Sequence, residues 1–258
     1  MRPWRNFAGV YQRLGPPLRP CGSDVERTRQ ALPADDARLL LLGVTPELSV
    51  LGRELIAVDN SPRMLADVWP GDRAHRRAMI ADWTDLPFAD SSFDAVIGDG
   101  CLNSAPEHVE PVLDEAARVI APGGKFVFRA FCAPARPESL SMIENDPTGG
   151  GSGNFHALKW RVAMALAPSR PNAAVLVSDI LAAWNAIFPD RSKLASECGW
   201  SIEEIATIDA YESADHKLGF PTLDGFVAVL RPRFSDVKVI EAAGYPLADR
   251  CPTIACTK

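Results

Sequence analysis

The chain has 258 residues, of which 47% are hydrophobic and 23% charged, a balance typical of one globular domain with a large core. Its formal net charge of −6 argues against bulk binding of nucleic acid, because that function needs a basic surface. No apolar run reaches the roughly 18 residues that span a bilayer, and no apolar stretch follows the basic residues at the N-terminus. We therefore expect a cytoplasmic protein without a membrane or nucleic-acid partner.

The cysteines form no CxxC pair, and no histidine lies near them at the spacing of metal ligands. We expect reduced thiols and no metal site. Nothing in the pattern indicates an oligomeric state. The six cysteines are Cys21, Cys101, Cys132, Cys198, Cys251 and Cys256.

Residues 1–37 precede the first apolar run and are predicted to form an N-terminal cap. Residues 15–20 read GPPLRP, and the fixed φ of the prolines excludes a helix there. Ser23 or Asp24 is a suitable N-cap for a helix over about 25–32. The cap either lies over a ligand or packs as a structural arm against the sheet edge.

Between residues 38 and 132, apolar runs of strand length alternate with helix-like segments. Pro46 and Pro62 each fit the first turn of a helix, and Ser61 is a suitable N-cap. The alternation predicts a parallel sheet with right-handed crossovers. The predicted strands are 39–42, 54–58, 78–81, 93–98 and 125–131, and the predicted helices are 46–51, 62–68 and 106–120, the last stopped by 121–124, which read APGG.

Residues 133–220 have a different pattern and are predicted to form a mostly helical insertion or substrate lid. The glycine run 149–153 is the expected hinge or disordered segment. The chain then returns to the core over 221–258. Predicted helices in these parts are 138–145, 155–167, 178–187, 202–208 and 223–230, and two last strands, 237–242 and 253–257, are expected to pair at the edge of the sheet.

Three acidic residues follow three consecutive predicted strands: Asp59, Asp82 and Asp99. Ligands of α/β proteins bind at this edge of the sheet, so the three are expected to face one site. An acid in the position of Asp59 accepts both hydroxyls of a ribose. Asp82 is placed to accept a hydrogen bond from an adenine amino group, and Asp99 from an ammonium group. The alternative for each is a local role, as an N-cap or a turn former.

Neighbouring residues are assigned to the same site. Gly43 lets the main chain approach a ligand after the first strand, and Thr45 offers a hydroxyl there. Trp83 either stacks on a base or packs in the core. Asn60 and Met64 are placed beside Asp59, and Gly100 beside Asp99.

This constellation resembles the class I S-adenosylmethionine-dependent methyltransferases over about residues 38–130. Residues 81–100, ADWTDLPFADSSFDAVIGDG, are similar to the family's adenine-contacting acid, its variable loop and its fourth strand. Residues 119–124, VIAPGG, are similar to its L-x-P-G-G turn. The resemblance implies an α/β fold, with a Rossmann-like, mostly parallel seven-stranded sheet, an antiparallel last strand, a core over 38–132 and 221–258, and a helical insertion after the fifth strand.

The resemblance also implies S-adenosylmethionine as cofactor and assigns positions to it. Gly43 matches the glycine loop, Asp59 the ribose acid, Asp82 and Trp83 the adenine pocket, and Asp99 the methionine end. Tyr11 and Arg19 are added because many such enzymes have an N-terminal cap. The chain departs from the family's G-x-G-x-G loop, because residues 43–47 read GVTPE.

The expected function is therefore methyl transfer to a small-molecule acceptor. His156 and His216 are the candidate bases, since both lie in the insertion. The alternative is a non-catalytic binding or regulatory protein on the same fold, with a degenerate cofactor loop. A nicotinamide-dependent dehydrogenase is disfavoured because G-x-G-x-x-G is absent. A nucleic-acid amino methyltransferase is disfavoured because no Asn-Pro-Pro-Tyr or Asp-Pro-Pro-Tyr motif follows the fourth strand.

Overall fold

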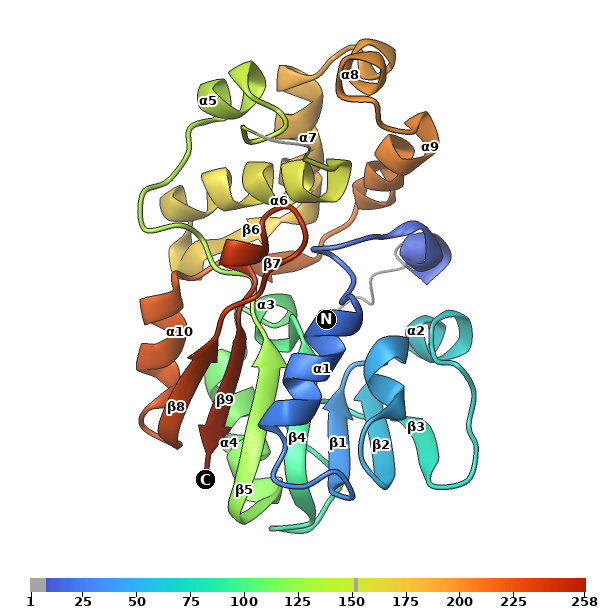
Figure 1. Ribbon diagram of the computed structural model, residues 1–258, viewed down its shortest axis with the longest axis vertical. Coiled ribbons are helices and arrows are strands. Elements are labelled where there is room, and N and C mark those ends of the chain that lie inside the picture. Colours follow the sequence, from blue (N-terminus) through green and yellow to red (C-terminus); the bar gives the residue numbers. More distant parts are fainter. Residues whose placement is uncertain (1–7, 151–152) are drawn as a thin grey trace.

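A computed structural model describes residues 8–150 and 153–258 and has a seven-stranded sheet at its centre (Figure 1). The strand order is β3-β2-β1-β4-β5-β9-β8. The first five strands are parallel, and β9 is antiparallel to both of its neighbours. The predicted Rossmann-like sheet with an antiparallel last strand is confirmed. The strands are β1 Arg38–Leu42, β2 Glu54–Asp59, β3 Arg76–Ile80, β4 Phe93–Asp99, β5 Ile120–Arg129, β8 Ser235–Ile240 and β9 Thr253–Thr257.

The leucine run of β1 is buried on both faces of the sheet. Leu39 and Leu41 belong to a core cluster shared with α1 and the insertion, whereas Leu40 and Leu42 belong to a second cluster shared with α4 and α10. Alternate side chains of a strand point to opposite faces, so a strand covered on both sides must be apolar throughout. This is why the sequence has no polar alternation here.

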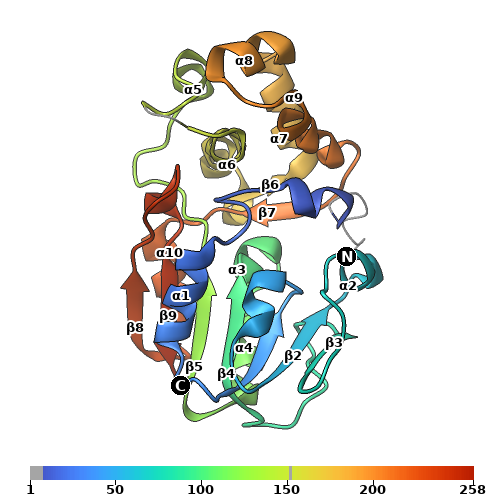
Figure 2. The ribbon, with the colours of Figure 1, turned by 45° about the vertical axis from the view of Figure 1, so that its right-hand side comes forward.

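Helices and 3-10 turns cover both faces of this sheet (Figure 2). The core helices are α1 Gly22–Ala31, α2 Pro62–Asp67, α3 Cys101–Ser104, α4 Val109–Val119 and α10 Leu223–Leu230, and the 3-10 helices are η1 Ala8–Arg13, η2 Pro46–Val50 and η6 Ala248–Arg250.

Several predicted boundaries are corrected. Helix α1 begins at Gly22, and Cys21 is its N-cap, so neither Ser23 nor Asp24 has that position. Asp24 instead lies one turn inside the helix and accepts a hydrogen bond from the Cys21 amide at 3.0 Å. A carboxylate at this third position completes a capping box, which is an equally good start signal.

Other differences concern strands. β3 begins at Arg76, two residues before the prediction, and β5 begins at Ile120 and crosses the predicted stop at 121–124. The register of β5 against β4 shifts there, between Phe93 and Ala95. The glycines of the stop therefore form an irregular strand start and not a free turn.

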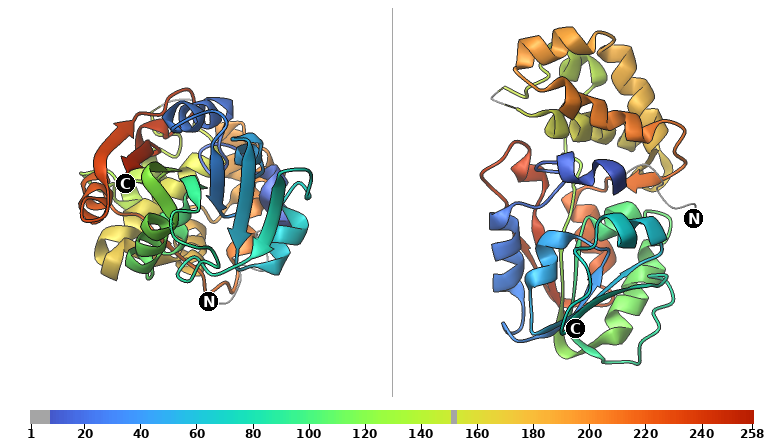
Figure 3. Two further views of the ribbon diagram at one scale, coloured as in Figure 1. Left: turned by 90° about the horizontal axis from the view of Figure 1, so that it is seen from below. Right: turned by 90° about the vertical axis from the view of Figure 1, so that its right-hand side faces the viewer.

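The insertion stands above the carboxyl-terminal edge of the sheet (Figures 1 and 3). Its central helix α6 has ten buried residues out of twelve, which explains why the sequence of this helix shows no polar face. A short antiparallel ribbon, β6 with β7, was not predicted, and neither was helix α8. The elements are α5 Leu140–Asn145, α6 Phe155–Leu166, η3 Ala167–Ser169, η4 Pro171–Ala173, β6 Ala174–Leu176, α7 Val177–Ile187, α8 Arg191–Cys198, α9 Ile202–Ile205, η5 Ala206–Tyr211 and β7 Lys217–Gly219.

Part of the predicted glycine hinge, residues 151–152, lies outside the described residues. Before it, the amides of Gly149 and Gly150 donate to Asp146 Oδ1 at 2.9 and 3.1 Å. Among the described helices, none has the length and apolar character needed to cross a bilayer.

Candidate functional site

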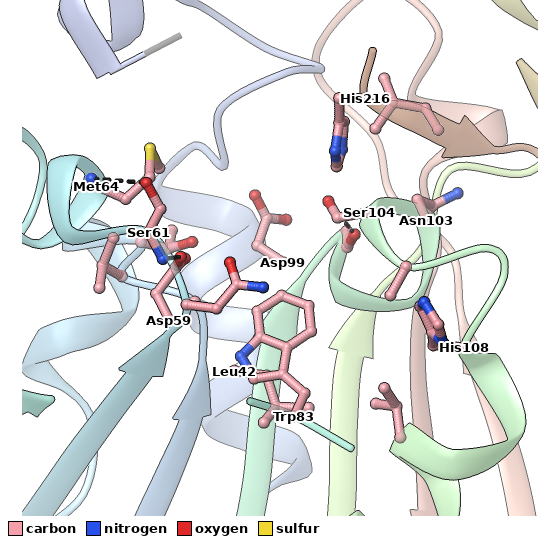
Figure 4. A pocket seen from close by; sticks show the side chains of 18 of the residues that line it. Leu42, Asp59, Ser61, Met64, Trp83, Asp99, Asn103, Ser104, His108 and His216 are labelled. Carbon is pink, nitrogen blue, oxygen red and sulfur yellow. Dashed lines mark hydrogen bonds between the residues drawn. The ribbon is translucent and has the colours of Figure 1, made fainter. Parts of the chain in front are cut away.

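A cavity of about 350 Å³ lies between the carboxyl ends of the strands and the insertion (Figure 4). We divide its lining into two parts. The strand-end half comprises Gly43, Thr45, Asp59, Asn60, Ser61, Met64, Asp82, Trp83 and Thr84. The insertion half comprises Asn103, Ser104, Phe131, Trp160, His216 and Leu218. Tyr11, Asp99 and Gly100 also line the cavity, so every predicted cofactor residue except Arg19 contributes to it.

Asp59 ends β2 and faces the cavity as a half-buried carboxylate (Figure 4). Its Oδ1 accepts a hydrogen bond from the amide of Ser61 at 2.8 Å. Burial raises the pKa of Asp59 to about 6, and the Ser61 amide opposes part of that shift. No described cation pairs with this carboxylate, which leaves Oδ2 for hydroxyl donors of a ligand. Ser61, which caps α2 through the Met64 amide at 3.3 Å, fixes the turn.

Asp82 and Trp83 follow β3. Asp82 is exposed, and its Oδ1 accepts hydrogen bonds from the amide and hydroxyl of Thr84 at 2.9 and 2.8 Å. These bonds lower the pKa of Asp82, so it is ionised at neutral pH. The Trp83 indole donates to the carbonyl of Val58 at 2.8 Å, which holds its ring beneath the first loop as one wall of the cavity.

The loop that follows β1 has no free amide at Gly43, because that amide donates a hydrogen bond to Val58 O at 2.8 Å. Gly43 has φ +99°, a conformation that favours glycine. Thr45 has φ −54°, so glycine is not required there. Pro46 has no N–H, and the short helix η2 therefore offers fewer backbone donors than the glycine loop that the resemblance implies.

Glu47 replaces the last glycine of that loop and is held from the N-terminal cap. The Tyr11 hydroxyl donates to Glu47 Oε2 at 3.1 Å, and Arg19 forms an ion pair with Glu47. The Arg19 guanidinium also lies 5.1 Å from the centroid of the Tyr11 ring. Arg19 thus braces the loop from outside the cavity, whereas Tyr11 reaches the cavity wall.

Asp99 ends β4 and is paired with a buried arginine. Arg129 is 2% exposed and donates to Asp99 Oδ1 and Oδ2 at 2.6 and 3.1 Å. Arg129 also donates to Asp24 of α1 at 3.3 Å. Burial alone would lower the pKa of Arg129, but the charge and hydrogen bonds of Asp99 raise it well above its ordinary value. Asp99 therefore lines the cavity while both its oxygens contact Arg129.

Gly100 brings the chain close to the end of β5. It has φ +60°, and a Cβ added there would lie 2.6 Å from a ring carbon of Phe131. Glycine is required on both counts. The close approach places the Phe131 ring at the border between the two halves.

Asn103 joins three segments at the insertion half. Its amide group donates to Phe131 O at 2.8 Å and Gly219 O at 2.6 Å, and its carbonyl accepts from Phe131 N at 3.0 Å. The side chain is almost completely buried. Asn103 thereby fastens β7 of the insertion to the core beside His216.

The two predicted bases have different surroundings. His216 lines the cavity, and Figure 4 shows its ring pointing toward Ser104. His156 is buried in α6 outside the cavity, with Nε2 3.2 Å from Glu204 Oε1. Burial lowers the pKa of His156 to about 3, so it is neutral.

Sequence reasoning missed most of the insertion half. Asn103 and Ser104 lie within five residues of Asp99, so extending the strand-end argument along the chain would have found them. Trp160 and Leu218 had no such signal, because they belong to segments whose pairing with the core is not visible in any local pattern.

The chain is similar to known proteins in sequence and in fold. A family model described as "Methyltransferase domain" matches residues 43–128. The demethylmenaquinone methyltransferase of Corynebacterium glutamicum (strain R) is 32% identical over 190 residues, which are 68% of this chain and 75% of that protein. The protein of the same name from Mycobacterium sp. (strain KMS) is 33% identical over 162 residues, 61% of this chain, and the match spans only 62% of that relative's length.

A similar fold occurs in a solved structure, an S-adenosylmethionine-dependent methyltransferase from Mesorhizobium loti. The two superpose with a TM-score of 0.51 and 17% identity, over 90% of this chain and 96% of that chain.

Proposed function

Because the chain belongs to the class I S-adenosylmethionine-dependent methyltransferases, we propose that it transfers the methyl group of that cofactor to a small-molecule acceptor. The observation that carries the proposal is the gathering of Asp59, Asp82 and Asp99, from three strand ends, around one cavity. A fold with three acids at one edge but no shared cavity would not support it.

The residues present fit the cofactor. Asp59 is a half-buried carboxylate that no described cation pairs with, as a site for two ribose hydroxyls requires. Asp82 keeps one oxygen for an amino group beside the indole of Trp83, which offers an aromatic face. When bound, the cofactor supplies an electrophilic methyl group on a sulfonium, so the protein mainly aligns the acceptor and excludes water.

At the amino-acid end we assign recognition to Asp99 and Tyr11. Asp99 offers a carboxylate whose charge is shared with Arg129, and Tyr11 offers a hydroxyl from the N-terminal cap. Arg19 acts indirectly, by holding Tyr11 and Glu47 together. In this arrangement side chains replace the backbone contacts of the missing glycines.

The acceptor is proposed to be small because the cavity, of about 350 Å³, lies between the sheet and the insertion, which we interpret as the substrate lid. The relatives' printed name, demethylmenaquinone methyltransferase, supports a small-molecule acceptor as well. Since the match spans only 62% of the Mycobacterium relative, the particular acceptor in that name is not assigned to this chain.

Calorimetry with S-adenosylmethionine and S-adenosylhomocysteine tests the proposal. We expect wild-type protein to bind both and Asp59→Ala to bind each at least about tenfold more weakly, which corresponds to about 1.4 kcal/mol. Asp67→Ala is the matched control, because Asp67 is an exposed acid of α2 that pairs with Arg63 and does not belong to the described lining of the cavity. Absence of binding to wild type, or equal binding by the two variants, would contradict the proposal.

A further inference from the structure

Apart from Asn103, whose side chain is hydrogen-bonded to main-chain groups of Phe131 and Gly219, the insertion half of the cavity is apolar except at two positions. Phe131 and Trp160 form an edge-to-face pair with ring centroids 5.4 Å apart, and Leu218 lies in the same wall. The polar groups are the hydroxyl of Ser104, which donates to Gly100 O at 3.0 Å, and the imidazole of His216. Such a surface suits a flat apolar ligand with one polar substituent.

From this arrangement we propose that the insertion half binds an uncharged aromatic acceptor carrying a hydroxyl group, and that His216 accepts the hydroxyl proton during methyl transfer. The inference rests on the proposed function and adds to it the chemical class of the acceptor and the base.

Charged acceptors lack a counterpart in this part of the cavity. None of the described residues that line the cavity is a lysine or an arginine, so none of them offers a permanent positive charge to an anionic acceptor. A cationic acceptor would need a carboxylate, and none of the described residues of the insertion half is acidic. A neutral hydroxyl needs only a hydrogen-bond acceptor, which a neutral imidazole provides.

His216 is held in place and is in the right protonation state. Its main-chain carbonyl accepts a hydrogen bond from Val177 at 3.0 Å, and Asn103 fastens the following strand to the core. The residue is only 9% exposed, and its ring points toward Ser104 (Figure 4). Burial lowers its pKa to about 4, against a smaller opposing effect of Asp215, so the imidazole is neutral at pH 7.

The step balances without a further reactant. The acceptor oxygen forms a bond to the methyl carbon, the carbon–sulfur bond breaks, and its electron pair neutralises the sulfonium. The hydroxyl proton goes to a ring nitrogen of His216 and leaves as the product is released. A positioned base of this kind contributes roughly 10²–10⁴-fold to the rate.

The acceptor class is tested by binding to protein saturated with S-adenosylhomocysteine. The probes are 2-naphthol, 2-naphthoate and 2-(aminomethyl)naphthalene, which share one ring system and differ in charge. We expect 2-naphthol to bind at least about tenfold more tightly than either charged probe. Equal or tighter binding of a charged probe, or no binding of 2-naphthol, would overturn the inference. Failure to bind S-adenosylhomocysteine at all would instead overturn the proposed function.

The role of His216 is tested by transfer of a labelled methyl group to naphthols of graded acidity. His216→Asn is expected to lose about 10²-fold or more in rate with 2-naphthol and much less with a nitro-substituted naphthol that is already ionised at the assay pH. S-Adenosylhomocysteine affinity should stay within twofold of wild type, which separates loss of the base from loss of the fold. An equal loss for all naphthols, or no loss, would overturn the assignment.

His75→Asn is the matched control for that variant. His75 is exposed and has φ +61°, a conformation that asparagine tolerates. Its rates should match wild type with every naphthol.

Discussion

The two halves of the cavity are built by different means. The strand-end half comes from short turns that directly follow parallel strands, and its acids lie at the end of a strand, as Asp59 does, or two residues beyond it, as Asp82 does. The insertion half combines α3, the end of β5, α6 and β7, which are separated by up to 116 residues, as in the bond between Asn103 and Gly219. Parallel strands bring their ends together by default, whereas the insertion half depends on individual tertiary contacts.

The largest expected effect concerns Asp99. The sequence assigns this residue to ligand binding, and in the structure it also forms a buried ion pair with Arg129. Arg129→Met should lower the free energy of unfolding by about 3–5 kcal/mol, because it leaves the buried carboxylate of Asp99 without its ion-pair partner and removes one of the partners of Asp24. Urea unfolding measures this. Arg63→Met, which removes an exposed partner of Asp67, should change stability by less than about 1 kcal/mol. Similar losses in the two variants would mean that the buried pair is not structural.

A second variant tests whether the two halves of the cavity are independent of each other in stability. Asn103→Ala should cost about 2–3 kcal/mol, because main-chain groups of Phe131 and Gly219 lose their buried partner. Hydrogen exchange should accelerate in the ribbon of β6 and β7 and remain slow in β1. Asn185→Ala, at an exposed residue of α7, serves as the control. Equal acceleration in β1 would show that the two halves are not independent.

The ends of the strands were predicted well because the spacing of apolar residues, their burial and the turn residues all agree there. The leucines of β1, the cap at Ser61 and the acids after three strands each follow from local sequence. The start of α1 was misplaced because a cysteine occupies the N-cap and Asp24 acts from inside the helix. Prediction from sequence works only where local cues decide the structure. The three-residue strands β6 and β7 gave no local signal, because they pair with each other across more than forty residues of sequence.

The cavity was predictable only on one side. Asp59, Asp82 and Trp83 could be placed because each follows a strand. His216 could be named only as a histidine of the insertion, since nothing local tells it apart from His156, which is buried elsewhere. Whether each histidine faces the cavity depends on how α6 and β7 pack against the core. No periodic pattern in the sequence indicates that packing.

The pH dependence of cofactor binding provides a smaller effect within the strand-end half. Because the pKa of Asp59 is raised to about 6, the unliganded carboxyl becomes protonated as the pH falls below 6. Its oxygens then lose acceptor strength, so affinity for S-adenosylhomocysteine should fall up to about tenfold per pH unit below that point. Calorimetry from pH 5 to pH 8 measures this. Asp59→Asn should bind weakly with little pH dependence, and a flat wild-type profile would contradict the ribose assignment.

The smallest effect concerns the altered loop. Thr45→Gly introduces the glycine that the family's loop has at this position. Because φ of Thr45 is −54° and does not require glycine, the substitution should lower stability by up to about 1 kcal/mol without tightening cofactor binding. Thermal unfolding and calorimetry give the two values. A gain in affinity of about tenfold or more would show that the loop lacks the backbone approach that glycine permits.

A crystal structure of the protein with S-adenosylhomocysteine tests the division of the cavity most directly. We expect the ribose hydroxyls within about 2.6–3.2 Å of the Asp59 carboxylate, the adenine beside Trp83, and the sulfur directed toward Ser104 and His216. The insertion half should remain open for the acceptor. A cofactor that contacts His216 and Trp160 through its adenosine, with Asp59 facing solvent, would contradict the account.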